Sequence, residues 1–264
     1  MLTDPGKGVK RRHERRKTGD LYVACGVHPA MAFLEARPED VARVLATKER
    51  RAEIEGAARA AGVRIEPAEP RDLDSVAGGT AHQGVAAVGR PPRTWTLPEL
   101  IDQGPEVILL LDGVTDPRNV GALLRTAEAC GVGGVVLMND RAPGLTPALV
   151  KAAAGATEWL PLARVANLAR SLDNLRRAGF WVIGLDAEGD CGLDDPDAIP
   201  GLPVALVVGA EGPGMRPLVQ RSCHRLVRVP MQGNTPSLNV SVAGAIALWE
   251  VNRRRMASAA SGKT

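Results

Sequence analysis

Residues Val229–Glu250 read VPMQGNTPSLNVSVAGAIALWE, a short apolar segment that leads through a loop of Gly, Asn, Pro and Ser into a helix of small residues. Ser237 and Asn239 stand at the start of that helix, where short polar side chains commonly cap unpaired backbone N–H groups. A cap needs one such residue, yet the loop also carries the amide of Asn234 and the hydroxyl of Thr235. This surplus of polar groups predicts a binding site.

Two further segments place a polar, glycine-bearing loop after an apolar strand. Residues 111–127 read LDGVTDPRNVGALLRTA, and residues 206–215 read LVVGAEGPGM. In this order and at this spacing, the three segments closely resemble the three motifs of the SpoU/TrmH class (SPOUT superfamily) of RNA ribose 2′-O-methyltransferases. The resemblance covers essentially the whole chain. Two short segments, GVH at 26–28 and HQG at 82–84, resemble the type that methylates a guanosine in bacterial 23S rRNA.

From residue 106 onward, apolar strands alternate with helices, which is typical of a parallel sheet covered by helices. The sequence predicts strands at 107–111, 134–138, 181–185, 204–208 and 226–229, and helices at 119–130, 147–155, 165–178, 213–220 and 238–255. Periodicity alone leads to a doubly wound α/β fold, since knots are rare. The resemblance implies a deep trefoil knot in the C-terminal portion and a homodimer built on it.

The chain is predicted to divide into four parts. Residues 1–18 form a basic tail, predicted to be disordered on its own, that either attracts RNA phosphates or is an idle solvated segment. Residues 19–90 read as a small α/β unit, which the resemblance implies to be a ribosomal-protein-L30e-like domain that binds the RNA substrate. The Pro-rich start of residues 91–105 reads as a linker. Residues 106–257 would form the methyltransferase domain.

Asn119 and Arg125 are the candidate catalytic residues of the first motif. Asn119 falls where a helix would begin, so its simplest role is that of an N-cap. Arg125 is flanked by apolar helix residues, so its charge is expected to need a designated partner. A carboxylate such as Glu211 or Asp112 would serve, as would an RNA phosphate, whose geometry suits a guanidinium. The resemblance implies catalytic roles for Asn119 and Arg125.

The second motif, GAEGPG at residues 209–214, predicts a close approach of backbone to ligand, because glycine has no Cβ. Glu211 would repel a pyrophosphate, whereas a carboxylate suits the sulfonium and neutral ribose of S-adenosylmethionine. The spacing also departs from the GxGxxG fingerprint of dinucleotide sites. The sequence therefore favours S-adenosylmethionine as cofactor over a nicotinamide dinucleotide.

The cofactor-binding residues are expected to be Gly209, Val229, Met231 and Leu238. The three apolar ones would either line a slot for adenine or belong to the plain core. The resemblance implies cofactor contacts for Gly209, Val229 and Leu238, and places Ser237 and Asn239 in the catalytic region. The full expected catalytic set is Asn119, Arg125, Glu211, Ser237 and Asn239.

Composition sets further expectations. The sequence contains no uninterrupted apolar run long enough to span a membrane and no signal-peptide core. This predicts a cytoplasmic protein without membrane contact. Its four cysteines lack metal-ligand spacing, so we expect unpaired thiols and no metal.

The predicted activity is transfer of a methyl group from S-adenosylmethionine to a ribose 2′-hydroxyl, expected to be that of a guanosine in 23S rRNA. Within the same class, the alternatives are a thiostrepton-resistance-type rRNA methyltransferase and a tRNA 2′-O-methyltransferase. Outside it, the alternatives are a non-catalytic RNA-binding ribosome-assembly factor and, less favoured by the loop spacing, a nucleotide-dependent oxidoreductase.

Overall fold

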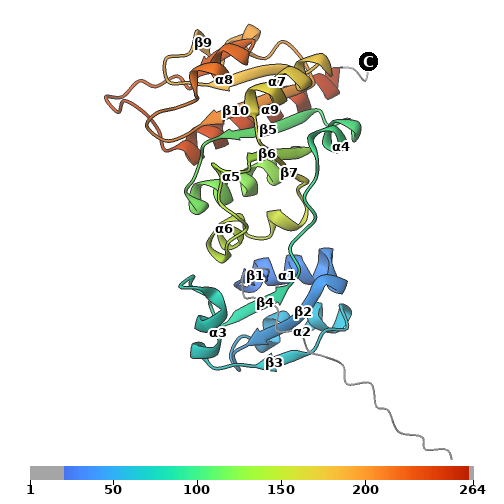
Figure 1. Ribbon diagram of the computed structural model, residues 1–264. Coiled ribbons are helices and arrows are strands. Elements are labelled where there is room, and N and C mark those ends of the chain that lie inside the picture. Colours follow the sequence, from blue (N-terminus) through green and yellow to red (C-terminus); the bar gives the residue numbers. More distant parts are fainter. Residues whose placement is uncertain (1–20, 262–264) are drawn as a thin grey trace, which may run out of the picture.

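Two β-sheets follow one another along the chain in the computed structural model, which describes residues 21–261 (Figure 1). The first sheet has four strands in the order β1-β4-β2-β3, and the second has seven in the order β7-β6-β5-β10-β8-β11-β9. The predicted basic tail of residues 1–18 lies outside the described residues. Within residues 21–261, no helix is both long and apolar enough to cross a membrane.

The N-terminal sheet is mixed: β4 runs antiparallel to β1 and β2, and β3 runs parallel to β2. Its strands are β1 (Tyr22–Cys25), β2 (Val41–Ala46), β3 (Ile65–Pro67) and β4 (Val85–Gly89). Since successive side chains of a strand point to opposite faces, the sheet buries an apolar cluster on each face. The small α/β unit expected from the sequence is therefore present.

Helices cover both faces of this sheet. The elements are α1 (Val27–Ala36), η1 (Pro38–Asp40), α2 (Arg51–Ala60) and α3 (Pro70–Ala77). Helices α1 and α2 pack on one face, and α3 packs on the other. The sequence pattern did not predict α3, because only Leu73 and Ala77 in that helix are fully buried.

The C-terminal sheet is parallel at every described strand pair. Its strands are β5 (Val107–Asp112), β6 (Gly134–Met138), β7 (Leu162–Val165), β8 (Trp181–Leu185), β9 (Cys191–Gly192), β10 (Val204–Gly209) and β11 (Arg225–Arg228). The predicted parallel α/β architecture is confirmed. Strand β7 was missed because it is short and contains a charged residue, Arg164, which donates to the backbone carbonyls of Met138 and Pro143.

Helices again cover both faces of the C-terminal sheet. One apolar cluster contains side chains of α5, α6 and α9, and a second contains side chains of α4, α7 and α8. The elements are α4 (Leu97–Asp102), α5 (Pro117–Ala129), α6 (Pro147–Ala153), η2 (Ala156–Glu158), α7 (Leu168–Arg177), η3 (Pro196–Ala198), α8 (Pro217–Ser222) and α9 (Val240–Ser261). The helix predicted at 213–220 therefore starts later, at Pro217, after the glycine loop.

The segment 91–105 is more structured than a simple linker. Helix α4 lies within it, and both Leu97 and Leu100 are buried against the second sheet. Trp95 makes a β-bridge with Ala163 of β7, and the Arg93 guanidinium lies 3.9 Å from the centroid of the Trp95 ring. Trp95 thus packs on the protein.

The two sheets are held together by packing between their helices as well as by the connecting chain. Val150 of α6 belongs to the same apolar cluster as β1 and α1. Gly155 approaches α1 so closely that a Cβ built there would lie 2.6 Å from the Cβ of Ala32. Only glycine fits at this point, and its φ of +101° also favours glycine.

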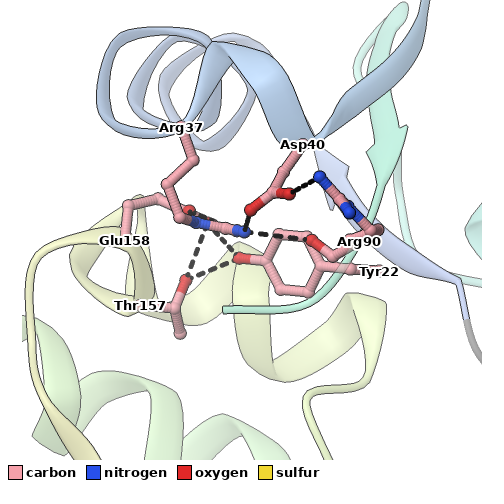
Figure 2. Close-up of polar contacts among 6 residues, drawn as sticks. All are labelled: Tyr22, Arg37, Asp40, Arg90, Thr157 and Glu158. Atoms are coloured by element: carbon pink, nitrogen blue, oxygen red, sulfur yellow. Dashed lines mark hydrogen bonds and ion pairs between the residues drawn. The ribbon is translucent and has the colours of Figure 1, made fainter. Parts of the chain in front are cut away.

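A buried polar cluster crosses this contact (Figure 2). Glu158 of η2, whose side chain is 0% exposed, accepts hydrogen bonds from Arg37 Nε at 3.0 Å and Nη2 at 2.8 Å, and from the Tyr22 hydroxyl. The Tyr22 and Thr157 hydroxyls lie 2.7 Å apart, and Arg37 Nη1 lies 2.8 Å from Asp40. Burial, followed by the charge of Glu158, raises the pKa of Tyr22 well above its ordinary value. Tyr22 therefore stays protonated and donates to Glu158.

The middle of α9 carries a second ionic group. Glu250 accepts hydrogen bonds of 2.7 Å from Arg253 and Arg254, and Arg254 also donates to the backbone carbonyls of Leu193, Asp195 and Pro196. Hydrogen bonds from Arg253, and then those from Arg254, lower the pKa of Glu250 to about 2. These contacts tie the last helix to the loop before η3.

Glu250→Gln is expected to flatten the acid limb of the stability profile. A glutamate has a pKa of about 4.3 when unfolded, so the stabilising charge of Glu250 is fully present above that pH and is lost as the pH falls towards about 2. The melting temperatures of wild type and variant should therefore differ at pH 7 and converge near pH 2. Thermal unfolding followed by circular dichroism checks this, with the exposed Glu128→Gln as control; an undiminished difference at pH 2 would contradict it.

Candidate active site

A cavity of about 410 Å³ lies at the carboxyl ends of β8, β10 and β11. Parallel sheets commonly bind ligands at this edge. The wall of the cavity also includes the start of α9 and the glycine loop after β10. All four predicted cofactor-binding residues and two of the predicted catalytic ones line it: Gly209, Val229, Met231, Leu238, Glu211 and Ser237. Met231 is 40% exposed, so for this residue the alternative of plain core is wrong.

The glycine loop is a turn closed by two backbone hydrogen bonds. Ala210 N donates to Gly214 O at 3.1 Å, and Gly214 N donates to Ala210 O at 3.0 Å. The chain folds back so tightly that a Cβ on Gly209 would lie 2.3 Å from Met215 N. Gly212 has a φ of +83°, which side chains rarely tolerate. The loop therefore presents Glu211 at the rim of the cavity.

The charged residues that line this cavity within the described chain are all acidic: Asp186, Glu188 and Glu211. Asp186 accepts a 3.0 Å hydrogen bond from Gln220 and a 2.9 Å bond from the backbone N–H of Glu188. Such a lining attracts a cation and repels a phosphate. Asp186 and Glu188 were not predicted from the sequence; their only signal there is a pair of carboxylates directly after a buried strand.

A chain of hydrogen bonds joins the three sequence motifs. Asn119 Nδ2 donates to Glu211 Oε2 at 3.4 Å, and Asn239 Nδ2 donates to Asn119 Oδ1 at 3.2 Å. Asn239 Oδ1 in turn accepts from the backbone N–H of Ser241 at 2.9 Å and from its hydroxyl at 2.6 Å. Asn239 is thus the residue that caps α9. Three of the five predicted catalytic residues, Asn119, Glu211 and Asn239, are brought together.

Asn119 does not cap α5, which corrects its simplest interpretation. Asp116 is the cap, because its side chain accepts from the backbone N–H of Arg118 at 2.8 Å. Asn119 lies in the first turn, and its amide is free to bridge Glu211 and Asn239.

The expected environment of Arg125 was wrong. Its side chain is exposed, and no carboxylate of residues 21–261 forms an ion pair with it. Glu211 pairs with Asn119, while Asp112 binds Arg216. The apolar neighbours of Arg125 in the sequence face the core on another side of α5, so the guanidinium stays in water.

Comparison with known proteins agrees with this geometry. A profile described as the SpoU rRNA Methylase family matches residues 106–249. The chain belongs to the SpoU rRNA methylase family. A second profile, described as RNA 2'-O ribose methyltransferase substrate binding, matches residues 23–95. The resemblance seen in the three sequence motifs is confirmed.

Members of the SpoU family resemble this chain over nearly its full length. It is 41% identical to the 23S rRNA (guanosine-2'-O-)-methyltransferase RlmB of Bordetella pertussis, in a match that covers 88% of this chain and 97% of that protein. The RlmB protein of Pseudomonas syringae pv. tomato is 42% identical, with 88% and 95% covered.

A solved structure has the same fold. The SpoU methyltransferase AviRb from Streptomyces viridochromogenes, in complex with AdoMet, is 27% identical and superposes with a TM-score of 0.73, covering 90% of this chain and 91% of that one. An AdoMet-bound rRNA methyltransferase from Sinorhizobium meliloti is 25% identical, with a TM-score of 0.72, and the match covers 89% of this chain and 88% of that one.

Proposed function

We propose that this protein transfers a methyl group from S-adenosylmethionine (AdoMet) to the ribose 2′-hydroxyl of a guanosine in 23S rRNA. The observation that carries the proposal is the hydrogen-bonded chain Glu211–Asn119–Asn239 at the rim of an acidic cavity. Identities of 41% and 42% to RlmB proteins support the choice of 23S rRNA and guanosine.

AdoMet fits the acidic cavity in its chemistry. Its sulfonium is attracted by the carboxylates of Asp186, Glu188 and Glu211, and it carries no phosphate to be repelled. The apolar side chains of Val229, Met231 and Leu238 would hold the adenine, and the backbone at Gly209 would lie against the cofactor. Relatives solved with AdoMet bound support this assignment.

When bound, AdoMet supplies the methyl group, and the 2′-hydroxyl that receives it must lose its proton. Asn119 and Asn239 hold one another in place and fix the Glu211 carboxylate. Glu211 and the nearby Ser237 hydroxyl would supply the acceptors for the departing proton. Orientation of the reactants could supply roughly 7–11 kcal/mol of the rate acceleration in favourable cases.

Arg125 would act on the RNA as a cation and not as a base, since a guanidinium keeps its proton in nearly all protein settings. Its exposed position suits a phosphate, which a guanidinium binds with two hydrogen bonds. It would then grip the backbone of the target nucleotide and stabilise charge that develops on the 2′-oxygen.

The N-terminal unit, residues 19–90, would bind the RNA substrate, and residues 106–257 would carry out the transfer. The match of residues 23–95 to a substrate-binding profile supports this division. We also propose that the C-terminal portion contains the trefoil knot of the SPOUT superfamily. The loops after β10 and β11, which line the acidic cavity, belong to this portion.

A homodimer accounts for the apolar stripe on α9. Val242, Ile246, Trp249 and Met256 are exposed large apolar side chains, and their spacing places them along one side of the helix. A second copy seated there would bury this surface.

Transfer of labelled methyl from AdoMet to separate tRNA, 16S and 23S transcripts, followed by alkaline hydrolysis, tests the function. A 2′-O-methyl group blocks cleavage at its own linkage, so label should appear in a resistant dinucleotide beginning with G, from 23S RNA alone. Label in tRNA would favour the tRNA type. Failure to bind AdoMet would favour a non-catalytic assembly factor.

A further inference from the structure

A second cavity lies beside the proposed AdoMet cavity and differs from it in charge. It has a volume of about 360 Å³ and is lined by the end of β5 and by the loops after β6 and β10. Ala210, Pro213 and Gly214 line both cavities, so the glycine loop is the wall between them. Whereas the charged groups of the first cavity are acidic, this one contains two arginines, Arg141 and Arg216.

The single acidic residue that lines the second cavity in the described chain, Asp112, is already neutralised. Its side chain is 0% exposed, and it accepts from the backbone N–H and from Nε of Arg216, both at 2.8 Å, while Nη2 lies 2.7 Å away. This buried pairing locks the Arg216 guanidinium in one orientation. Nη1 of Arg216 makes no hydrogen bond within residues 21–261 and remains available to a ligand.

Arg141 supplies the uncompensated charge. It is exposed, and within the described part of the chain its guanidinium makes no hydrogen bond and no ion pair. The cavity therefore combines one fixed guanidinium with one free guanidinium, an arrangement that suits the oxygens of a phosphate diester.

One wall of the cavity belongs to a loop that leads towards the N-terminal unit. Residues 139–146 lead from β6 to α6, and α6 packs against β1 of the N-terminal sheet (Figure 1). Leu145, in the same loop as Arg141, already contacts the apolar cluster of that sheet. An RNA strand that reaches from the N-terminal unit to the AdoMet cavity would thus pass Arg141.

We propose that this cavity binds a backbone phosphate of the substrate RNA beside the methylated nucleotide, an assignment that rests on the proposed function. The arginines attract the polyanion on one side of the glycine loop, while the carboxylates on the other side attract the sulfonium of AdoMet. The RNA phosphate would thus bind on one side of the glycine loop and AdoMet on the other, and the two reactants would meet at Glu211.

Arg141→Gln tests the site, with the exposed Arg170→Gln on α7 as the control for loss of one positive charge. Binding of a labelled 23S rRNA transcript is measured at several salt concentrations, and AdoMet binding is measured by calorimetry. We expect Arg141→Gln to bind RNA roughly tenfold more weakly and to bind AdoMet like wild type. The salt slope, which is the slope of the logarithm of the RNA-binding constant against the logarithm of the salt concentration, should be smaller in magnitude by about one. Arg141→Lys, which keeps the charge, should restore the slope. Arg216 is not a suitable target, because its loss would strand the buried Asp112 carboxylate.

Equal RNA affinities and salt slopes for Arg141→Gln and Arg170→Gln would overturn the phosphate site. Failure of the proposed function is distinguishable, since wild type would then leave the 23S transcript unmethylated. If wild type methylates 23S RNA and Arg141→Gln leaves both RNA affinity and slope unchanged, the function stands and the site does not.

Discussion

Asn119→Ala is expected to lower the rate of methyl transfer about 100-fold, the loss typical when one preorganised polar group of a reaction centre is removed. The amide holds Glu211 on one side and Asn239 on the other, at 3.4 and 3.2 Å. Without this amide, both hydrogen bonds are lost by which α5 connects the glycine loop to the start of α9. Asn119 does not line the AdoMet cavity, so AdoMet affinity should be nearly unchanged.

Asn119→Asp separates the two halves of this role. The new carboxylate still accepts from Asn239, but it faces Glu211 and repels it, so activity should stay as low as in Asn119→Ala. Single-turnover rates with saturating AdoMet and 23S transcript measure the effect, and the exposed Asn174→Ala on α7 is the control. Full activity of Asn119→Asp would exclude the contact with Glu211 from the mechanism.

The three motifs allowed much of this site to be predicted from sequence because each follows a strand of one parallel sheet. The carboxyl ends of such strands meet at one edge, so Asn119, Glu211 and Asn239 converge even though they are far apart in the chain. Asp186 escaped prediction because a carboxylate after a strand is common, and only the folded structure shows that it lines a cavity.

Arg125 shows where local sequence misleads. Leu123 and Leu124 beside it are fully buried, yet the side chain between them and Thr126 points into solvent, because neighbours on a helix are about 100° apart. The residues on either side of a charged helix residue therefore say little about whether its side chain is buried. The overall helix pattern predicts the buried stripe better than it predicts any single polar position.

The contact between the two units left no trace in the sequence pattern. Its partners are 121 to 136 positions apart along the chain, from Arg37 and Tyr22 to Glu158. Each residue is ordinary on its own, and TEWL at 157–160 reads as a loop. Only the fold brings the fully buried carboxylate of Glu158 against a tyrosine and an arginine of the N-terminal unit.

Glu158→Ala is expected to lower the free energy of unfolding by about 3 kcal/mol, the lower end of the loss seen when one member of a buried ion pair is removed. Arg37 keeps Asp40 at 2.8 Å, which limits the loss, but its contact with the C-terminal unit disappears. Tyr22 likewise keeps only the Thr157 hydroxyl. Urea denaturation measures the change. The control is Glu55→Ala, which removes the exposed pair with Arg59 and should leave the free energy of unfolding nearly unchanged.

Loosening of this contact should also uncouple the two units. Wild type is expected to unfold in one transition, while Glu158→Ala should show two, because less of the N-terminal unit's stability then depends on α6 and η2.

The chain between the units should also become more accessible to protease in Glu158→Ala. In wild type Arg90 pairs with Asp40, and Asp40 is held by Arg37. Trypsin does not cleave the bond between Arg90 and Pro91, so the site to follow is the bond after Arg93, which should be cut faster in Glu158→Ala than in Glu55→Ala. A single transition and equal cleavage rates would mean that the apolar contacts of Val150 and Gly155 suffice to hold the N-terminal unit against the catalytic one, and that the buried polar cluster adds nothing to its orientation.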